Sequence, residues 1–206
     1  FKKPESFEKA ILYLLENLLR IASETTENFR LSQKKKIPEI LKNKKIKLDL
    51  GAGGKKKVGF IGVDAILGWD VDVKHNLEYG IPFPDNSVSE IYSSHFFEHL
   101  QHKKVTFLLN ECSRVLKPNG KITIEVPDLE KSLQSFLGMD EKEKWESGWE
   151  AIFGNQKKEY EFHKTGFTNR RLLNLFKGTG FKSIKISEYI HGTIPSLRVQ
   201  AVNGKT

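Results

Sequence analysis

The chain has 206 residues, of which 38% are hydrophobic and 29% are charged, enough for one globular domain with a sizeable core. Its longest apolar run, residues 11–15, is far shorter than the roughly 20 residues of a membrane-spanning helix, and without a secretory signal pattern we expect a cytoplasmic protein. The formal net charge is +8, and the single cysteine, Cys112, excludes an internal disulfide and a multi-cysteine zinc site.

Residues 6–30 are predicted to form one helix. Ser6 can cap its N-terminus, and apolar residues recur at helical spacing along it. We expect this helix to pack on the sheet that the rest of the chain forms. The alternative is an amphipathic helix that lies on a membrane surface.

The following segment, residues 34–57, is rich in lysine. It contains ten lysines and only two acidic residues, Glu39 and Asp49, so it carries the whole excess charge of the chain. Such a segment is most simply a solvated surface, or else a patch for nucleic acid, acidic lipid or an anionic substrate. No arginine or aromatic residue lies among these lysines, so nucleic-acid binding is poorly supported.

The most informative pattern covers residues 46–64. The run Ile46-Lys-Leu-Asp-Leu-Gly-Ala-Gly-Gly54 predicts a buried strand and a glycine loop, and Gly59-Phe-Ile-Gly-Val-Asp64 predicts a second strand that ends in a carboxylate. Glycines let a ligand lie directly on the backbone, and an acidic residue at the end of the next strand can accept ribose hydroxyls. The pattern therefore predicts a nucleoside site at the carboxyl edge of an α/β sheet.

The same pattern argues against a dinucleotide. That fingerprint needs a third glycine three residues after the second and a helix whose N-terminus holds pyrophosphate. Here Lys56 occupies that position, and the few residues before the second strand leave no room for a helix. S-adenosylmethionine, a nucleoside without phosphates, fits such a loop better.

The remaining elements follow in alternation. Strands are predicted near residues 71–76 and 88–94, a helix over 101–116, and a strand over 121–126. An aromatic-rich insertion, residues 128–167, precedes a helix over 169–177. Two closing strands are predicted over 181–187 and 197–202.

Three of these segments resemble class I S-adenosylmethionine-dependent methyltransferases. Asp49-Leu-Gly-Ala-Gly53 looks like motif I, residues 75–100 look like the third-to-fourth strand region, and residues 114–127 look like the turn into strand 5. The resemblance implies an α/β, Rossmann-like three-layer fold with a seven-stranded mixed sheet whose last strand is antiparallel. It divides the chain into an N-terminal helical extension (1–45) and a methyltransferase domain (46–206). The connections after strands 1 and 2 are too short for the family's usual helices.

The resemblance also assigns a cofactor site for S-adenosylmethionine. Asp49 would face the methionine ammonium, Asp64 would bind the ribose, and Asn76 with Leu77 would contact the adenine. The predicted cofactor-binding residues are Asp49, Gly51, Ala52, Gly53, Asp64, Asn76, Leu77, Ser94 and His95.

Two histidines are the predicted catalytic residues. His95 follows strand 4, where a base would face the methyl group, and His163 ends the insertion 128–167, which we expect to form a lid or acceptor pocket. Glu98 and His99 lie one turn into the next helix, where a local partner for the carboxylate is the simplest expectation. No metal is expected, because the histidines lack the spacing of a local metal motif.

The sequence thus predicts an S-adenosylmethionine-dependent methyltransferase whose acceptor is a small molecule or a glycan. One alternative is an RNA or protein methyltransferase that docks through the lysine-rich segment. Another is a non-catalytic protein that binds the cofactor. The oligomeric state does not follow from the sequence.

Overall fold

The computed structural model describes residues 37–42, 45–66 and 70–205. It divides into two units, Phe1–Lys42 and Asn43–Thr206. In the first unit, residues 37–40 are helical. The helix predicted over residues 6–30 lies outside the described residues, so its packing on the sheet stays a prediction.

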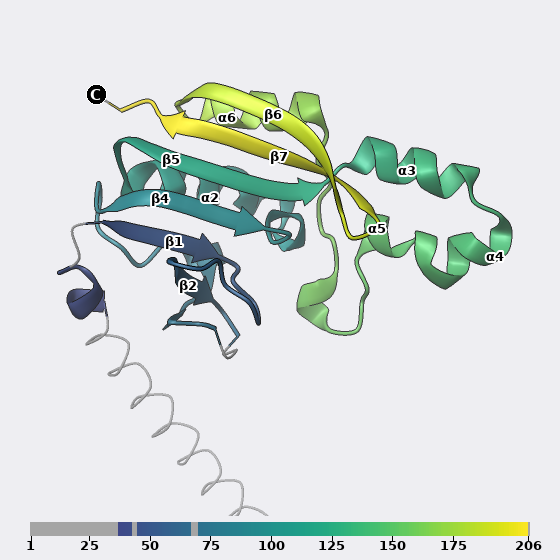
Figure 1. Cartoon of the computed structure of the whole chain (residues 1–206), viewed down its shortest axis with the longest axis horizontal. Coiled ribbons are helices and arrows are strands. Elements are labelled where there is room, and N and C mark those ends of the chain that lie inside the picture. Colours follow the sequence, from purple (N-terminus) through teal and green to yellow (C-terminus); the bar gives the residue numbers. More distant parts are fainter. Residues whose placement is uncertain (1–36, 43–44, 67–69, 206) are drawn as a thin grey trace, which may run out of the picture. The chain divides into compact units, whose positions relative to one another are not determined.

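The second unit is built on a seven-stranded sheet (Figure 1). The strands are β1 (Ile46–Leu50), β2 (Ile61–Asp64), β3 (Val73–Lys74), β4 (Val88–Ser94), β5 (Leu116–Pro127), β6 (Phe181–His191) and β7 (Ile194–Asn203). Their order is β3-β2-β1-β4-β5-β7-β6, and β7 runs antiparallel to both of its neighbours. The predicted α/β fold with a mixed sheet and an antiparallel last strand is confirmed.

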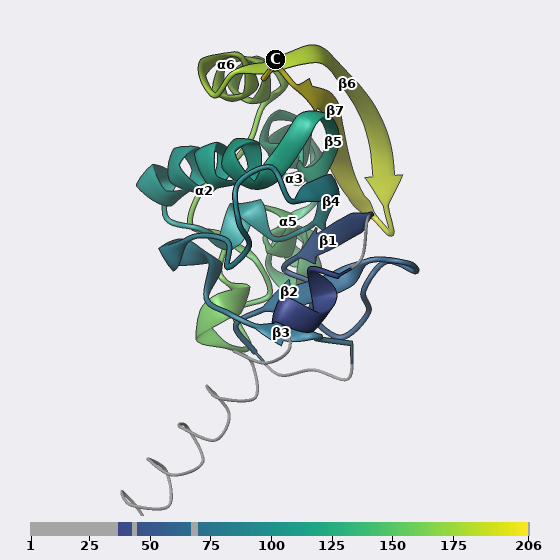
Figure 2. The same ribbon diagram turned by 90° about the vertical axis from the view of Figure 1, so that its left-hand side faces the viewer.

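Two helices, α2 (His102–Val115) and α6 (Asn169–Gly178), lie on the same side of this sheet (Figure 2). Helix α2 is amphipathic, and apolar residues at helical spacing are fully buried. Alternate residues of β5 and β7 are buried on the face of the sheet that packs against the helices, because every second side chain of a strand points to the same face. These buried residues are Val105, Leu108, Leu109, Cys112 and Val115 of α2, and Ile122, Ile124, Val126, Leu197, Val199 and Ala201 of the sheet.

The opposite face of the central strands is polar. Tyr92 and Ser94 both donate to Oε2 of Glu125, at 2.6 and 2.8 Å, and Arg198 Nε donates to Oε1 at 2.6 Å. Burial would raise the pKa of Glu125, but these three hydrogen bonds hold it below its usual value. These strands therefore carry hydrogen-bonded polar groups on this face.

The β1–β2 connection contains turns and no helix, as the sequence predicts. The insertion 128–167 begins and ends side by side, because Asp128 and Phe167 form a parallel bridge. It carries the helical segments α3 (Leu129–Gly138), α4 (Glu141–Glu143), η3 (Lys144–Gly148), α5 (Glu150–Phe153) and η4 (Glu159–Glu161). Figure 1 shows α3 to α5 beyond the carboxyl end of β5. No described helix is both long and apolar enough to cross a membrane.

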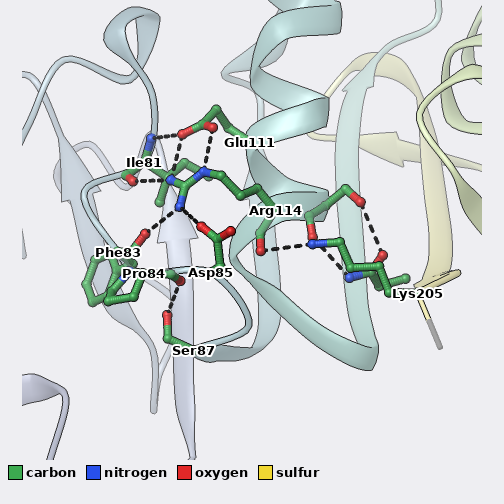
Figure 3. Close-up of polar contacts among 10 residues, drawn as sticks. Ile81, Phe83, Pro84, Asp85, Ser87, Glu111, Arg114 and Lys205 are labelled. Carbon is green, nitrogen blue, oxygen red and sulfur yellow. Dashed lines mark hydrogen bonds and ion pairs between the residues drawn. The ribbon is translucent and has the colours of Figure 1, made fainter.

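Arg114, in the last turn of α2, fixes the loop that leads into β4 (Figure 3). Its guanidinium donates to the carbonyl oxygens of Ile81 and Phe83, to Asp85, and to both oxygens of Glu111. Glu111 also accepts from the Ile81 backbone N–H at 2.9 Å. The hydrogen bond from Arg114 holds the pKa of Glu111 below its ordinary value of 4.5.

We predict that Glu111→Gln makes the protein less stable at neutral pH by about 1.5–3 kcal/mol, the value of hydrogen bonds to a charged group. A carboxyl with a lowered folded-state pKa stabilises the fold above its unfolded pKa, and this contribution is lost as the pH falls through the folded pKa. The stability difference between wild type and Glu111→Gln should therefore shrink below pH 4.5. Urea denaturation across pH measures it. Asp85→Asn, at a side chain that is 67% exposed, is the control and should cost much less. A difference that does not change with pH would contradict the prediction.

Candidate cofactor and acceptor site

The glycine loop turns sharply from β1 toward β2. Gly51 and Gly53 have φ angles of +70° and +55°, which glycine adopts readily. The loop is held by the Gly51 N–H, which donates to the Val63 carbonyl at 2.9 Å. A Cβ on Gly51 would overlap the ring of Phe96, whereas a Cβ on Gly53 or Gly54 would meet nothing within 4 Å. The backbone of Gly53 and Gly54 is thus open to a ligand, whereas Phe96 occupies the side of Gly51 on which a Cβ would stand.

The two predicted carboxylates have different positions. Asp64 ends β2, and its two oxygens accept from the Gly53 and Ile66 N–H groups, each at 2.9 Å. Asp49 is buried in β1 and accepts from the Lys57 N–H at 2.7 Å. Burial raises the pKa of Asp49 above its ordinary value, and the Lys57 bond only partly opposes this. Asp64 therefore lies at the surface of the site. Asp49 instead holds the part of the β1–β2 loop that contains Lys57.

Asn76 follows β3 and begins the short helical turn η1 (Leu77–Tyr79). Its side-chain oxygen accepts from the Glu78 N–H at 2.9 Å, so it acts as a helix cap. Leu77 beside it is buried. The predicted pair therefore lies at the carboxyl edge of the sheet, next to β2.

A cleft of 580 Å³ joins these elements. Its lining includes most of the predicted cofactor residues, namely Gly51, Gly53, Asp64, Asn76, Leu77 and His95. Asp49, Ala52 and Ser94 are not among the described residues that line it. The Ser94 hydroxyl instead donates to Glu125 on the polar face of the sheet.

His95 leaves β4 with φ +50°, an uncommon value for a residue with a side chain. Its N–H donates to the Glu125 carbonyl, and its ring packs against the ring of His191, with the centroids 4.2 Å apart. Nε2 of His95 is buried and has no hydrogen-bond partner. His95 therefore reaches the cleft from a strained backbone position, as active-site residues often do.

His163 does not line the cleft. It lies beside Glu98 and His99 and lines a separate cavity of 10 Å³ with Glu98. Burial lowers the pKa of His163, and the nearby Glu98 charge opposes this. The two predicted catalytic histidines thus occupy neighbouring but different places.

Several cleft residues were not predicted. Phe96 lies over Gly51, and the insertion contributes Glu159, Tyr160, Glu161 and Lys164. The aromatic content of the insertion was the only signal for the second group. No sequence signal pointed to the contact between Phe96 and Gly51, since it depends on how the β4 end meets the loop.

Comparison with known proteins agrees with this geometry. Residues 48–124 match a family model described as a methyltransferase domain. No curated protein sequence matches the chain.

Solved structures share the fold. An S-adenosylmethionine-dependent methyltransferase from Archaeoglobus fulgidus is 19% identical, with a TM-score of 0.53 over 84% of this chain and 94% of that chain. One from Methanosarcina mazei is 17% identical, with a TM-score of 0.53 over 78% and 93%. The 1,6-didemethyltoxoflavin-N1-methyltransferase of Burkholderia thailandensis, solved with its substrate and S-adenosylhomocysteine, is 13% identical, with a TM-score of 0.54 over 98% and 92%.

The chain thus has the fold of S-adenosylmethionine-dependent methyltransferases of known structure, and residues 48–124 resemble a methyltransferase domain. S-adenosylmethionine is the cofactor of these structural relatives.

We predict that Gly51→Ala destabilises the protein more than Gly53→Ala. Both variants place a side chain at positive φ, which costs roughly 1–2 kcal/mol, but only the first also overlaps Phe96. Thermal unfolding of the two variants measures the difference. The double variant Gly51→Ala/Phe96→Ala should recover part of the loss beyond additivity. Equal melting temperatures for the two glycine variants would contradict the prediction, because they would mean that the Phe96 ring can move away from the new side chain without loss of stability.

Proposed function

We propose that this protein transfers a methyl group from S-adenosylmethionine, bound in the 580 Å³ cleft, to a small-molecule or glycan acceptor. The observation that carries the proposal is that one cleft is lined by the glycine loop, Asp64, Leu77 and His95. These groups come from the ends of four neighbouring parts of the sheet, where ligands of open α/β folds bind.

The residues present fit the cofactor. The open backbone of Gly53 and Gly54 can receive it, and the Asp64 oxygens keep unused lone pairs for the ribose hydroxyls. The buried Leu77 offers an apolar surface for the adenine. Bound S-adenosylmethionine supplies a methyl group on a sulfonium. The protein's contribution is to hold the acceptor in line with it and keep water out.

The acceptor side of the cleft comes from the insertion and from His95. Tyr160, Glu161 and Lys164 of the insertion line the same cleft as the glycine loop. Polar groups of this kind, set in a cleft of a few hundred cubic ångströms, suit a small polar molecule. The Burkholderia thailandensis relative in fold also has a small-molecule acceptor, 1,6-didemethyltoxoflavin.

Three lysines of the basic segment make contacts within the domain. Lys47 pairs with Glu90, Lys56 pairs with Asp72, and Lys57 lies 3.8 Å from the Tyr92 ring centroid. The charges of these three lysines therefore stabilise the glycine loop and the polar face of the sheet. The observation favours a small acceptor over a nucleic acid docked on this segment.

We predict that Asp64→Ala weakens binding of S-adenosylhomocysteine by about 10–150-fold, since hydrogen bonds to a charged group contribute roughly 1.5–3 kcal/mol. Isothermal titration calorimetry measures the affinity. Asp140→Ala is the matched control, because Asp140 caps helix α4 and does not line the cleft. Wild-type affinity in Asp64→Ala would remove this residue from the site, and no binding by the wild type would overturn the proposed function.

Turnover is tested separately with radiolabelled S-adenosylmethionine and a panel of small hydroxyl, amine and carbohydrate acceptors. Label transfer to one class of acceptor would support the proposal. Tight cofactor binding without transfer to any small molecule, together with transfer to RNA or protein, would overturn the acceptor class.

A further inference from the structure

A cluster of three side chains lies where the β4 end, η2 (Phe97–His99) and the insertion meet. Glu98, His99 and His163 each offer one ligand atom, and these atoms all lie within 4.8 Å of one another. The two histidines are far apart in the sequence, so no local motif marks the group. The end of the insertion brings His163 there through the Lys164 and Thr165 N–H groups, which donate to the Glu98 carbonyl at 2.8 and 3.2 Å.

The carboxylate of Glu98 is the decisive feature. Glu98 is 1% exposed, and neither of its oxygens has a hydrogen-bond partner. Nδ1 of His95 lies 3.3 Å from Oε1, an ion pair only when the imidazole is charged. Burial of a carboxylate without a partner is costly, and buried charges are normally paired or bound to a metal. Apart from the His95 contact, this carboxylate is unpaired among the described residues, so a cation beside it would be stabilised.

A hydrogen bond to the backbone fixes which ring nitrogen of His99 carries its proton. Its Nδ1 lies 3.0 Å from the Phe162 carbonyl oxygen, and because a carbonyl can only accept, Nδ1 carries the proton. Nε2 is then left with a lone pair. Histidines that bind metals typically donate their other ring N–H to a backbone carbonyl or a carboxylate in this way.

The ligand set defines the class of cation. Two imidazoles and one carboxylate suit zinc or another first-row divalent metal better than magnesium or calcium, and three protein ligands leave positions open. Bond lengths of roughly 2.0–2.2 Å require the ligand atoms to close in from their present separations. A 10 Å³ cavity lies against two of these ligands, Glu98 and His163.

We propose that Glu98, His99 and His163 bind one divalent transition-metal cation, and that its open positions take an oxygen of the acceptor. His99 also lines the 580 Å³ cleft, so the cluster adjoins the site assigned to methyl transfer. A bound cation holds a hydroxyl group in place and lowers its pKa. The role in acceptor binding rests on the proposed function, whereas the metal site rests on its own geometry.

The test uses the full chain without a polyhistidine tag, freed of metal by a chelator and dialysed. Zn²⁺ is titrated by calorimetry, and Co²⁺ by its visible absorption, in the absence of cofactor and acceptor. We expect one ion per chain, and at least about a 10-fold loss of affinity in His99→Ala and in His163→Ala, the size seen when metal-site partners are removed. His102→Ala is the matched control, since the His102 ring contacts Arg171 and lies outside the cluster.

Equal Zn²⁺ binding in wild type, His99→Ala and His163→Ala would overturn the site, as would no stoichiometric binding by a folded wild type. Glu98→Gln adds a second readout, because it removes the buried charge while keeping the shape. It should lose Zn²⁺ affinity and keep a melting temperature, without metal, at or above that of wild type; a large loss of stability would show that an internal contact already satisfies the charge. Since S-adenosylhomocysteine binding is measured separately, failure of the metal site and failure of the proposed function are distinguishable.

Discussion

The arrangement of the second unit depends on the burial of one face of its sheet beneath α2 and α6. Alternate residues of β4, β5 and β7 are apolar and fully buried, for example Ile91, Ile124 and Val199. A shift of one residue in any of these strands would send its apolar side chains to the opposite face. Hydrophobic burial therefore sets the register, and the register sets where each strand ends.

The cleft is a consequence of that register. Because β1, β2, β3 and β4 run parallel, the glycine loop, Asp64, Asn76 and His95 all follow carboxyl ends at the same edge. The supporting contacts are hydrogen bonds of the backbone, as between Gly51 and Val63, or of carboxylates with backbone N–H groups, as for Asp49 and Asp64. A site held in this way keeps its shape before any ligand arrives, which lowers the cost of ordering it on binding.

The face of the sheet opposite α2 and α6 is polar in its central strands. Tyr92, Glu125 and Arg198 form a hydrogen-bonded group on this face, and the Arg198 side chain is 41% exposed. Burial and the bond to Glu125 raise the pKa of Tyr92 to about 12, so it stays a neutral donor. A polar face needs no covering layer to avoid exposing apolar surface. The same strands thus contribute apolar side chains to the core on one face, and polar side chains that hydrogen-bond to one another on the other face.

Much of this protein followed from the sequence alone. The glycine loop with Asp64 indicated the cofactor class, and the apolar periodicity located the strands and α2, because glycine geometry and period-two burial are local properties. The sequence could not show that β4, β5 and β7 turn polar residues to one face. It could not show that Asn76 and Asp49 are engaged by backbone groups, or that Phe96 lies on Gly51. Nor could it show that Glu98, His99 and His163 meet, because the insertion brings together residues separated by more than sixty positions. Such contacts depend on long-range packing, and only the tertiary structure determines them.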